Sequence, residues 1–223
     1  MTKTPSPVSS ESKWPFVTLG SVTDELFVGL PVSRHQAKPG QESIQEPVLS
    51  VGDIHEGRLT LPADLPRTSL RPGSYERFRT RSNDILVSCR GSQVKAARVL
   101  QEAPSFLVSS NLIVVRPGGR LLPGFLLAIL KSQAWQERLR LRSRSSSGMV
   151  QLTARDLAEL PIPLPPMRVQ TDLVALVEAE EEHYWSAMRA AHLRRALVET
   201  LVAEVLLGPS AGGKEPSHVT EHG

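Results

Sequence analysis

Residues 160–166 read LPIPLPP, and residues 167–207 continue as MRVQTDLVALVEAEEEHYWSAMRAAHLRRALVETLVAEVLL without a glycine or a proline. The prolines of the first segment predict a stiff, extended linker, because proline does not continue a helix. The second segment predicts one helix, which Gly208 and Pro209 end. At ~1.5 Å per residue, a helix of this length is on the order of 60 Å long, more than a small domain spans.

An apolar stripe runs along this expected helix at spacings of three, four and seven residues. Its members are Leu173, Val177, Tyr184, Met188, Ala191, Val198, Val202 and Val205. Such a stripe is typical of a helix that packs against another helix, so we expect a coiled-coil contact with a partner chain. The alternative is a helix that folds back on its own domain. The proline-rich linker favours the first interpretation, because it would direct the helix away.

The residues before the linker predict strands and short helices. β-branched runs between turn residues indicate strands at 48–51, 84–89 and 111–115. The segments 34–47 and 61–73 are expected to be long loops. Beyond these strands the apolar spacing becomes helical, as Phe125, Ile129, Trp135 and Leu139 illustrate, and Thr153 is a candidate N-cap of a short helix.

These elements predict an α+β fold with one mixed α/β domain. We expect that domain at residues 14–166, followed by the long coiled-coil helix at 167–207. Residues 1–13 are rich in Ser, Thr and Pro, and we expect them and the tail at 208–223 to be disordered.

Composition excludes several classes of protein. Cys89 is the single cysteine, so neither an internal disulfide nor a cysteine zinc site is possible, which fits a reducing cytoplasm. No apolar run is long enough for a membrane span, and the N-terminus lacks an apolar signal segment. The histidines have no metal-ligand spacing, and no glycine-rich phosphate loop or methyltransferase motif is present. We therefore expect a protein without catalytic, metal or cofactor sites of its own.

The charge is distributed unevenly. Residues 1–166 hold 21 Lys/Arg and 14 Asp/Glu, a net +7, whereas residues 167–207 hold 4 and 7, a net −3; the tail adds −1, which gives the total of +3. A basic domain suits a polyanion, and an acidic helix suits a protein partner. The acidic run is Glu178, Glu180, Glu181 and Glu182. The alternative for both segments is ordinary solvated surface charge.

Two basic clusters are candidates for binding DNA, because arginine grips both phosphate and guanine edges with a planar fork. The first cluster consists of Arg90, Ser92, Gln93, Lys95 and Arg98. The second consists of Arg138, Arg140, Arg142, Arg144 and Ser146. The second cluster gathers its arginines on one side only if it is extended, and in a helix they spread around the axis. Arg77, Arg79 and Arg81 alternate and either follow a DNA backbone or form a plain exposed edge.

Several stretches resemble the target recognition domain of type I restriction–modification specificity subunits. Residues 14–22 (WPFVTLGSV) are similar to the pattern W-x-x-V-x-L-G-x-V, and residues 51–59 (VGDIHEGRL) to V-x-D-I-x-x-G-x-I. Residues 83–92 (NDILVSCRGS) resemble G-D-I-L-I-S-x-R-G-S, and residues 110–116 (SNLIVVR) resemble x-N-L-I-V-I-R. The run from Gly148 to Gln170 resembles G-x-x-x-x-L-T, then D-L-x-x-I-P-I-P-L-P-P-L-x-x-Q. Asn83 departs from the usual glycine, and Arg168-Val169 replaces the usual acidic pair.

The resemblance implies a half-length specificity subunit with one recognition domain instead of two. It implies that this chain binds double-stranded DNA and directs a partner adenine methyltransferase, which uses S-adenosylmethionine, to a bipartite site. A restriction subunit is a further partner that the resemblance allows. A homodimer, or a pair with another half-subunit, would rebuild the usual arrangement of two antiparallel helices. The alternative is a relic or repurposed half-subunit, a non-catalytic interaction module that dimerises through its helix without specific DNA binding.

Overall fold

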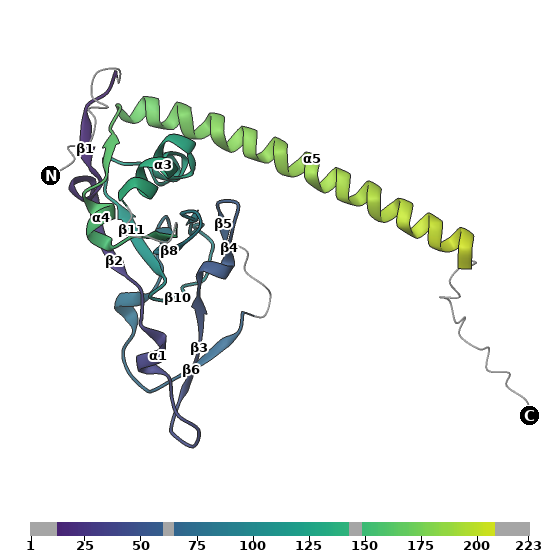
Figure 1. Cartoon of the computed structure of the whole chain (residues 1–223), viewed down its shortest axis with the longest axis horizontal. Helices are drawn as coiled ribbons and strands as arrows, with labels where there is room; N and C mark the ends of the chain where they lie inside the picture. Colours follow the sequence, from purple (N-terminus) through teal and green to yellow (C-terminus); the bar gives the residue numbers. More distant parts are fainter. Residues whose placement is uncertain (1–12, 60–64, 143–148, 208–223) are drawn as a thin grey trace, which may run out of the picture. The chain divides into compact units, whose positions relative to one another are not determined.

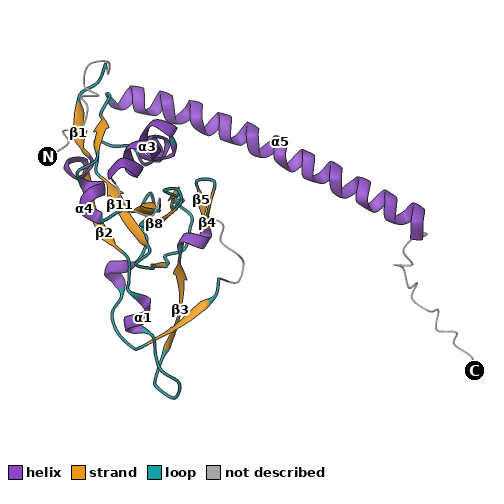
Figure 2. Cartoon of the chain, viewed as in Figure 1, coloured by secondary structure: helices purple, strands orange, loops and turns teal. Residues whose placement is uncertain are grey.

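The computed structural model describes residues 13–59, 65–142 and 149–207 (Figure 1). The chain divides into two compact units, residues 1–175 and 176–223, which are described separately. Strands and short helices make up the first unit, and the second consists of one helix in its described part (Figure 2). Of the expected disordered segments, only Lys13 is described, with its Nζ 5.2 Å from the centroid of the Trp14 ring. The remaining residues of those segments lie outside the described part.

The centre of the first unit is a four-stranded antiparallel sheet in the order β2-β11-β7-β9. Its strands are β2 (Thr23–Val28), β11 (Leu112–Pro117), β7 (Ile85–Ser88) and β9 (Ala96–Arg98). All four residues of β7 are buried, which agrees with the strand expected at 84–89. Because side chains alternate along a strand, Ile85 and Val87 enter one apolar core and Leu86 enters another.

Two helices build the larger core on one face of this sheet. They are α2 (Pro123–Lys131) and α3 (Gln133–Arg142), separated at Ser132. Phe125, Leu126 and Leu139 are buried there against the sheet residues. The helical spacing seen in the sequence is thus present, and it belongs to two helices.

A three-stranded sheet of order β10-β3-β6 lies next to the second core. Its strands are β3 (Ile44–Leu49), β6 (Arg67–Leu70) and β10 (Leu107–Val108), with β10 parallel and β6 antiparallel to β3. The expectation of long loops at 34–47 and 61–73 was therefore wrong where β3 and β6 run. The strand expected at 48–51 in fact begins at Ile44. Pro47 is tolerated because β10 pairs only with Val48 and Leu49.

The proline-rich segment is extended, as its composition predicts, and it is part of the first unit. Pro161–Pro163 forms strand β13, which pairs antiparallel with β1 (Phe16–Thr18). Leu160 and Ile162 are fully buried in the larger core. Proline is compatible with this two-stranded pairing because each strand has only one neighbour. Helix α4 (Ala154–Ala158) precedes it and begins with the expected Thr153 cap, in a reciprocal capping box with Asp156.

Short elements complete the first unit. They are α1 (Val32–His35), the hairpin of β4 (Ile54–His55) and β5 (Arg58–Leu59), the pair β8 (Arg90–Gly91) and β12 (Val150–Gln151), and 3₁₀ turns at Leu19–Val22, Val51–Asp53 and Glu76–Phe78. The hairpin turns through Glu56 and Gly57, both with positive φ (49° and 88°), as a two-residue turn of this type requires.

Helix α5 (Met167–Leu207) has the bounds that the sequence predicts. Gln170 anchors its first turn to the first unit: the buried amide accepts from the Leu122 backbone N–H at 2.9 Å and donates to the carbonyls of Arg120 and Pro165, each at 3.0 Å. From Ser186 to Leu206 every residue of α5 is exposed. No helix of the described residues is both long and apolar enough to cross a membrane.

Candidate nucleic-acid interface

Most of the first basic cluster lies on the short connection between β7 and β9. The Lys95 N–H donates to the Ser88 hydroxyl at 2.9 Å, and the Ser88 N–H donates to the Lys95 carbonyl at 2.8 Å. These bonds join the two ends of the connection, at residues 88 and 95. Arg90, Ser92 and Gln93 are exposed on it, while Val94 is buried beneath. Hereafter residues 89–95 are called the arginine turn.

Gly91 gives the arginine turn its shape. Its φ of +148° lies in a region that residues with a Cβ rarely adopt, and a Cβ at this position would lie 3.1 Å from the Gln93 carbonyl oxygen. Glycine is therefore the residue that suits this position of the turn.

Gln136 of α3 fixes the arginine turn to the helices. Its Oε1 accepts from the Val94 N–H at 3.2 Å, and its Nε2 donates to the Val94 carbonyl at 2.8 Å and the Leu130 carbonyl at 2.6 Å. The sequence gives no signal for this residue, because the contact joins positions 42 residues apart. Gln136 therefore brings the first cluster next to the helix that carries the second.

The pair β8–β12 makes a second connection between the two clusters. Arg90 lies opposite Gln151, and Gly91 lies opposite Val150. The chain leaves α3 at Arg142 and returns at Met149 to form this pair. Arg144 and Ser146, both predicted DNA contacts, fall between these points and lie outside the described residues.

The second cluster is helical, so its arginines spread around the axis of α3. Arg140 forms an ion pair with Glu137 on the exposed side (2.6 Å), which raises the pKa of Arg140. The Arg138 guanidinium lies over the Trp135 ring, 4.1 Å from its centroid, and its buried Nη1 has no hydrogen-bond partner among the described residues. Arg142, at the end of α3, is half-buried. The described members thus do not form a single arginine row.

Two residues predicted with the first cluster lead away from the arginine turn. Lys95 is exposed but donates from Nζ to the Ile54 carbonyl at 3.0 Å, at the β4–β5 hairpin. Arg98 is half-buried on β9, and its guanidinium lies beside Gly124 at the start of α2. A Cβ added at Gly124 would lie 3.2 Å from Nη1 of Arg98. The exposed part of the first cluster is therefore centred on Arg90, Ser92 and Gln93.

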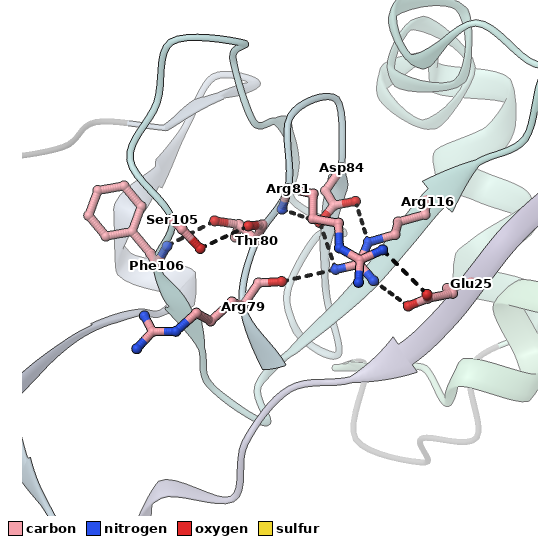
Figure 3. A network of polar contacts seen from close by, with 8 residues as sticks. All are labelled: Glu25, Arg79, Thr80, Arg81, Asp84, Ser105, Phe106 and Arg116. Carbon is pink, nitrogen blue, oxygen red and sulfur yellow. Dashed lines mark hydrogen bonds and ion pairs between the residues drawn. The ribbon is translucent and has the colours of Figure 1, made fainter. Parts of the chain in front are cut away.

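Two of the three alternating arginines before β7, Arg79 and Arg81, have acidic partners. Arg79 pairs with Glu46 at 2.8 Å and with Glu76 at 3.0 Å, and Arg81 lies 3.5 Å from Glu25. Figure 3 shows Arg79, Arg81 and Glu25 around a further residue, Arg116 of β11. These acidic partners neutralise part of the positive charge that the sequence assigns to this segment.

Arg116 itself is nearly inaccessible and ties three elements together. It donates from Nε to Asp84 at 3.0 Å and from Nη2 to the Arg79 carbonyl at 2.9 Å, and it forms an ion pair with Glu25 of β2 (Figure 3). Burial raises the pKa of the Asp84 carboxyl, while hydrogen bonds from the Arg81 N–H and Arg116 oppose that shift. In the sequence, Arg116 stands out only as part of a motif, and the structure gives it a positioning role.

Cys89 is buried at the start of the arginine turn, with Sγ 3.7 Å from the Ser110 carbonyl oxygen. Burial raises the pKa of its thiol to about 11, so the residue is the small hydrophobe that its position predicts. Among the described residues, no three histidine, cysteine or acidic side chains gather closely enough to hold a metal ion.

Comparison with known proteins identifies the family. The model of the type I restriction modification DNA specificity domain matches residues 36–179, more than half of the chain. The chain belongs to this family. A comparison with curated protein sequences finds no match.

Solved structures share the fold of this specificity domain. A chain from a study of complex assembly and conformational transition of the type I R-M system matches with a TM-score of 0.59 and 22% identity, over 88% of this chain and 46% of the other. The HsdS subunit from Thermoanaerobacter tengcongensis matches with a TM-score of 0.54 and 22% identity, over 92% and 48%. The type IIG restriction endonuclease BpuSI matches at 0.52 and 13%, over 73% and 26%. The chain therefore spans less than half the length of these proteins.

The geometry explains the departure of this specificity domain from its motif at Asn83. Asn83 has a φ of +68°, the left-handed region that glycine adopts freely and that asparagine tolerates better than most residues. The Asn83 N–H also donates to the Val99 carbonyl at 2.9 Å, which closes the turn before β7. Asparagine thus replaces glycine here without changing the turn.

Proposed function

We propose that this chain is the sequence-specific DNA-recognition subunit of a type I restriction–modification system and has no catalytic activity of its own. The observation that supports this most directly is the exposed arginine turn, which Gln136 and the β8–β12 pair hold next to α3. Rigid support matters because base readout needs side chains held in one register along the duplex.

Arg90 and its neighbours supply the chemistry that such a site requires. Arginine binds phosphate or the O6 and N7 of guanine through two parallel hydrogen bonds, and Ser92 and Gln93 can donate to base edges or phosphates. Their exposure suits a contact with double-stranded DNA. Arg142 at the end of α3 would add phosphate neutralisation.

Family membership and the exposed helix α5 together suggest the partners. We propose that two recognition domains assemble through α5, whose apolar residues are exposed, and read a bipartite site. An adenine methyltransferase subunit that uses S-adenosylmethionine would then act at that site, with a restriction subunit as a further member of the complex. The pairing of α5 would use the stripe from Leu173 to Val205, whose members beyond Val177 are exposed.

A binding measurement with the purified chain tests the DNA contact. A fluorescent DNA duplex of mixed sequence should bind the chain, and the logarithm of the association constant should fall linearly with the logarithm of the salt concentration. Arg90→Ala and Arg142→Ala should each weaken binding and reduce the salt slope by about 1. Arg67→Ala removes an exposed arginine from the other sheet and serves as the matched control. An unchanged slope in the first two variants would refute the proposed interface.

The second candidate is a non-catalytic interaction module that pairs through α5 without reading DNA. The exposed apolar residues of α5 support pairing under either function, and the ion pairs of Arg79, Arg81 and Arg140 reduce the free positive charge of the domain. Absence of salt-dependent DNA binding, with pairing intact, would favour this second function.

A further inference from the structure

A second group of exposed cations lies away from the arginine turn, where the chain after α1 meets the end of β6. Gln36 pairs with Leu70, and the Ala37 N–H donates to the Ser69 carbonyl at 3.0 Å. Figure 1 shows α1 and β6 far from α3, the helix that supports the arginine turn. Four exposed basic side chains stand on the two segments that meet here, and they are called the α1 patch: Arg34, Lys38, Arg71 and Arg77.

Arg71 joins the two segments through its backbone and its guanidinium. Its N–H donates to the His35 carbonyl at 2.9 Å, and its Nη2 donates to the Arg34 carbonyl. The Tyr75 hydroxyl donates to the Arg71 carbonyl at 2.8 Å, and the rings of Tyr75 and His35 meet edge to face, with centroids 5.5 Å apart. Tyr75 is buried in a small core cluster with Leu70. The α1 patch therefore stands on a packed base.

Arg77 belongs to the same surface. It stands in the 3₁₀ turn that follows Tyr75, and Phe78 of that turn packs against the core cluster beneath the patch. The Arg77 guanidinium lies over the Phe78 ring, 4.5 Å from its centroid. This contact holds the charge near the protein surface and leaves the N–H groups at the edge of the guanidinium plane available to a ligand.

No acidic side chain of the described residues neutralises the α1 patch. None of its four cations forms an ion pair within that part of the chain. Glu46 and Glu76, on the adjoining elements, both pair with Arg79, at 2.8 and 3.0 Å. Glu42, four residues after Lys38, forms no ion pair with it in the described structure. Cations gathered without counter-charges create a positive potential that attracts a polyanion.

We propose that the α1 patch binds the sugar–phosphate backbone of duplex DNA, outside the base pairs that the arginine turn contacts. This proposal rests on the proposed function and adds to it a contact that is independent of sequence. Phosphates fit this surface better than base edges, because α1 is a single turn of helix, too short to lie along a groove. Phosphate contacts fix the position of a protein on the duplex, and both arginine and lysine make them.

Equilibrium DNA binding by the full-length chain tests the α1 patch. The probe is a fluorescent duplex of mixed sequence, several helical turns long. Arg34→Ala/Arg71→Ala should weaken binding about tenfold and reduce the salt slope by about 2, since each phosphate contact contributes about 0.9. Arg34→Lys/Arg71→Lys keeps both charges and should keep the wild-type slope. An unchanged slope in the alanine variant, or an equal loss in both variants, would overturn the proposal.

The alanine variant is designed to remove charge without disturbing the fold. The contacts of Arg71 with His35 and Tyr75 use its backbone N–H and carbonyl, which alanine retains. Arg67→Ala is the matched control on the same strand, because its Nη1 donates to the Gln45 carbonyl at 3.2 Å, outside the patch. Urea unfolding should give all these variants nearly the same midpoint, so that a loss of slope reports on charge.

Arg90→Ala is measured beside the patch variants to keep this proposal separate from the proposed function. A reduced slope in Arg90→Ala, with none in Arg34→Ala/Arg71→Ala, would overturn the α1 patch and leave the arginine turn in place. A reduced slope in the patch variant alone would support the α1 patch and overturn the role of the arginine turn.

Sequencing of DNA that the complex with the methyltransferase subunit has modified separates phosphate contacts from base readout. Arg34→Ala/Arg71→Ala should methylate the same motif as wild type, to a lower extent at limiting protein, because phosphate contacts carry no sequence information. A changed motif would overturn the assignment of the α1 patch to the DNA backbone.

Discussion

Arg116 on β11 donates from Nε to Asp84 Oδ1 at 3.0 Å, with the two side chains only 9% and 1% exposed. Asp84 also accepts from the Arg81 N–H at 2.8 Å, which closes the turn immediately before β7. The pair therefore fixes the start of β7, the strand whose far end leads into the arginine turn. An ionic contact deep in the domain thus helps position the residues that we propose for DNA binding.

Removing the carboxylate of this pair should be costly. Asp84→Ala leaves the buried Arg116 charge with Glu25 as its one ionic partner among the described residues, and the free energy of unfolding should fall by about 3 kcal/mol. Arg155→Ala breaks an exposed, solvent-screened ion pair with Glu159 and should lower the free energy of unfolding far less. Urea unfolding of both variants gives the comparison. Equal losses would contradict a structural role for the buried pair.

The contribution of Asp84 to the free energy of unfolding should change with pH in the direction opposite to that of most paired carboxylates. Burial raises the pKa of Asp84 above its ordinary 3.8, so the folded protein holds this proton more tightly than the unfolded chain. The contribution of Asp84 to the free energy of unfolding should therefore fall as pH rises through the window above 3.8. The difference between wild type and Asp84→Asn, measured in urea across that window, reports it. A difference that grows with pH would contradict the raised pKa.

Cys89 should react with thiol reagents only when the domain opens. Burial raises its pKa to about 11, so at pH 8 the folded protein holds almost no thiolate and shields the sulfur. Labelling with an aromatic disulfide reagent should be slow in buffer and complete in denaturant. Chain denatured before labelling is the control. Rapid labelling of the folded protein would show that the arginine turn opens locally.

Gln136 should affect DNA affinity through position rather than charge. Gln136→Ala removes three hydrogen bonds to Val94 and Leu130 and frees the arginine turn from α3. DNA affinity should fall about tenfold while the salt slope stays unchanged, because no charge is lost. Gln133→Ala, on the exposed side of the same helix, is the matched control. A reduced slope in Gln136→Ala would mean that the amide contacts the DNA indirectly through a neighbouring cation.

Local sequence signals were sufficient for elements that depend on local contacts. The bounds of α5 and the Thr153 cap of α4 follow from uninterrupted helical residues and from a capping box within four positions. The strand β7 follows from a continuous apolar run between turn residues.

Elements that depend on distant partners were not predictable in the same way. The segment Pro161–Pro163 becomes a strand only because β1, far away in sequence, pairs with it, and β3 contains Pro47 among polar residues. The residues of the candidate site also fall into predictable and unpredictable ones. Arg90 was predicted from its motif and charge, whereas the contacts of Gln136 and the ion pairs of Arg79 depend on long-range packing.

The most direct test of the central claim is methylome sequencing of DNA modified in cells that make this chain together with its adenine methyltransferase subunit. A homodimeric recognition subunit predicts methylated adenines in one bipartite motif whose two halves are inverted repeats. That motif should disappear when Arg90→Ala and Arg142→Ala are combined. The absence of any modified motif, although the two subunits purify together, would contradict the account.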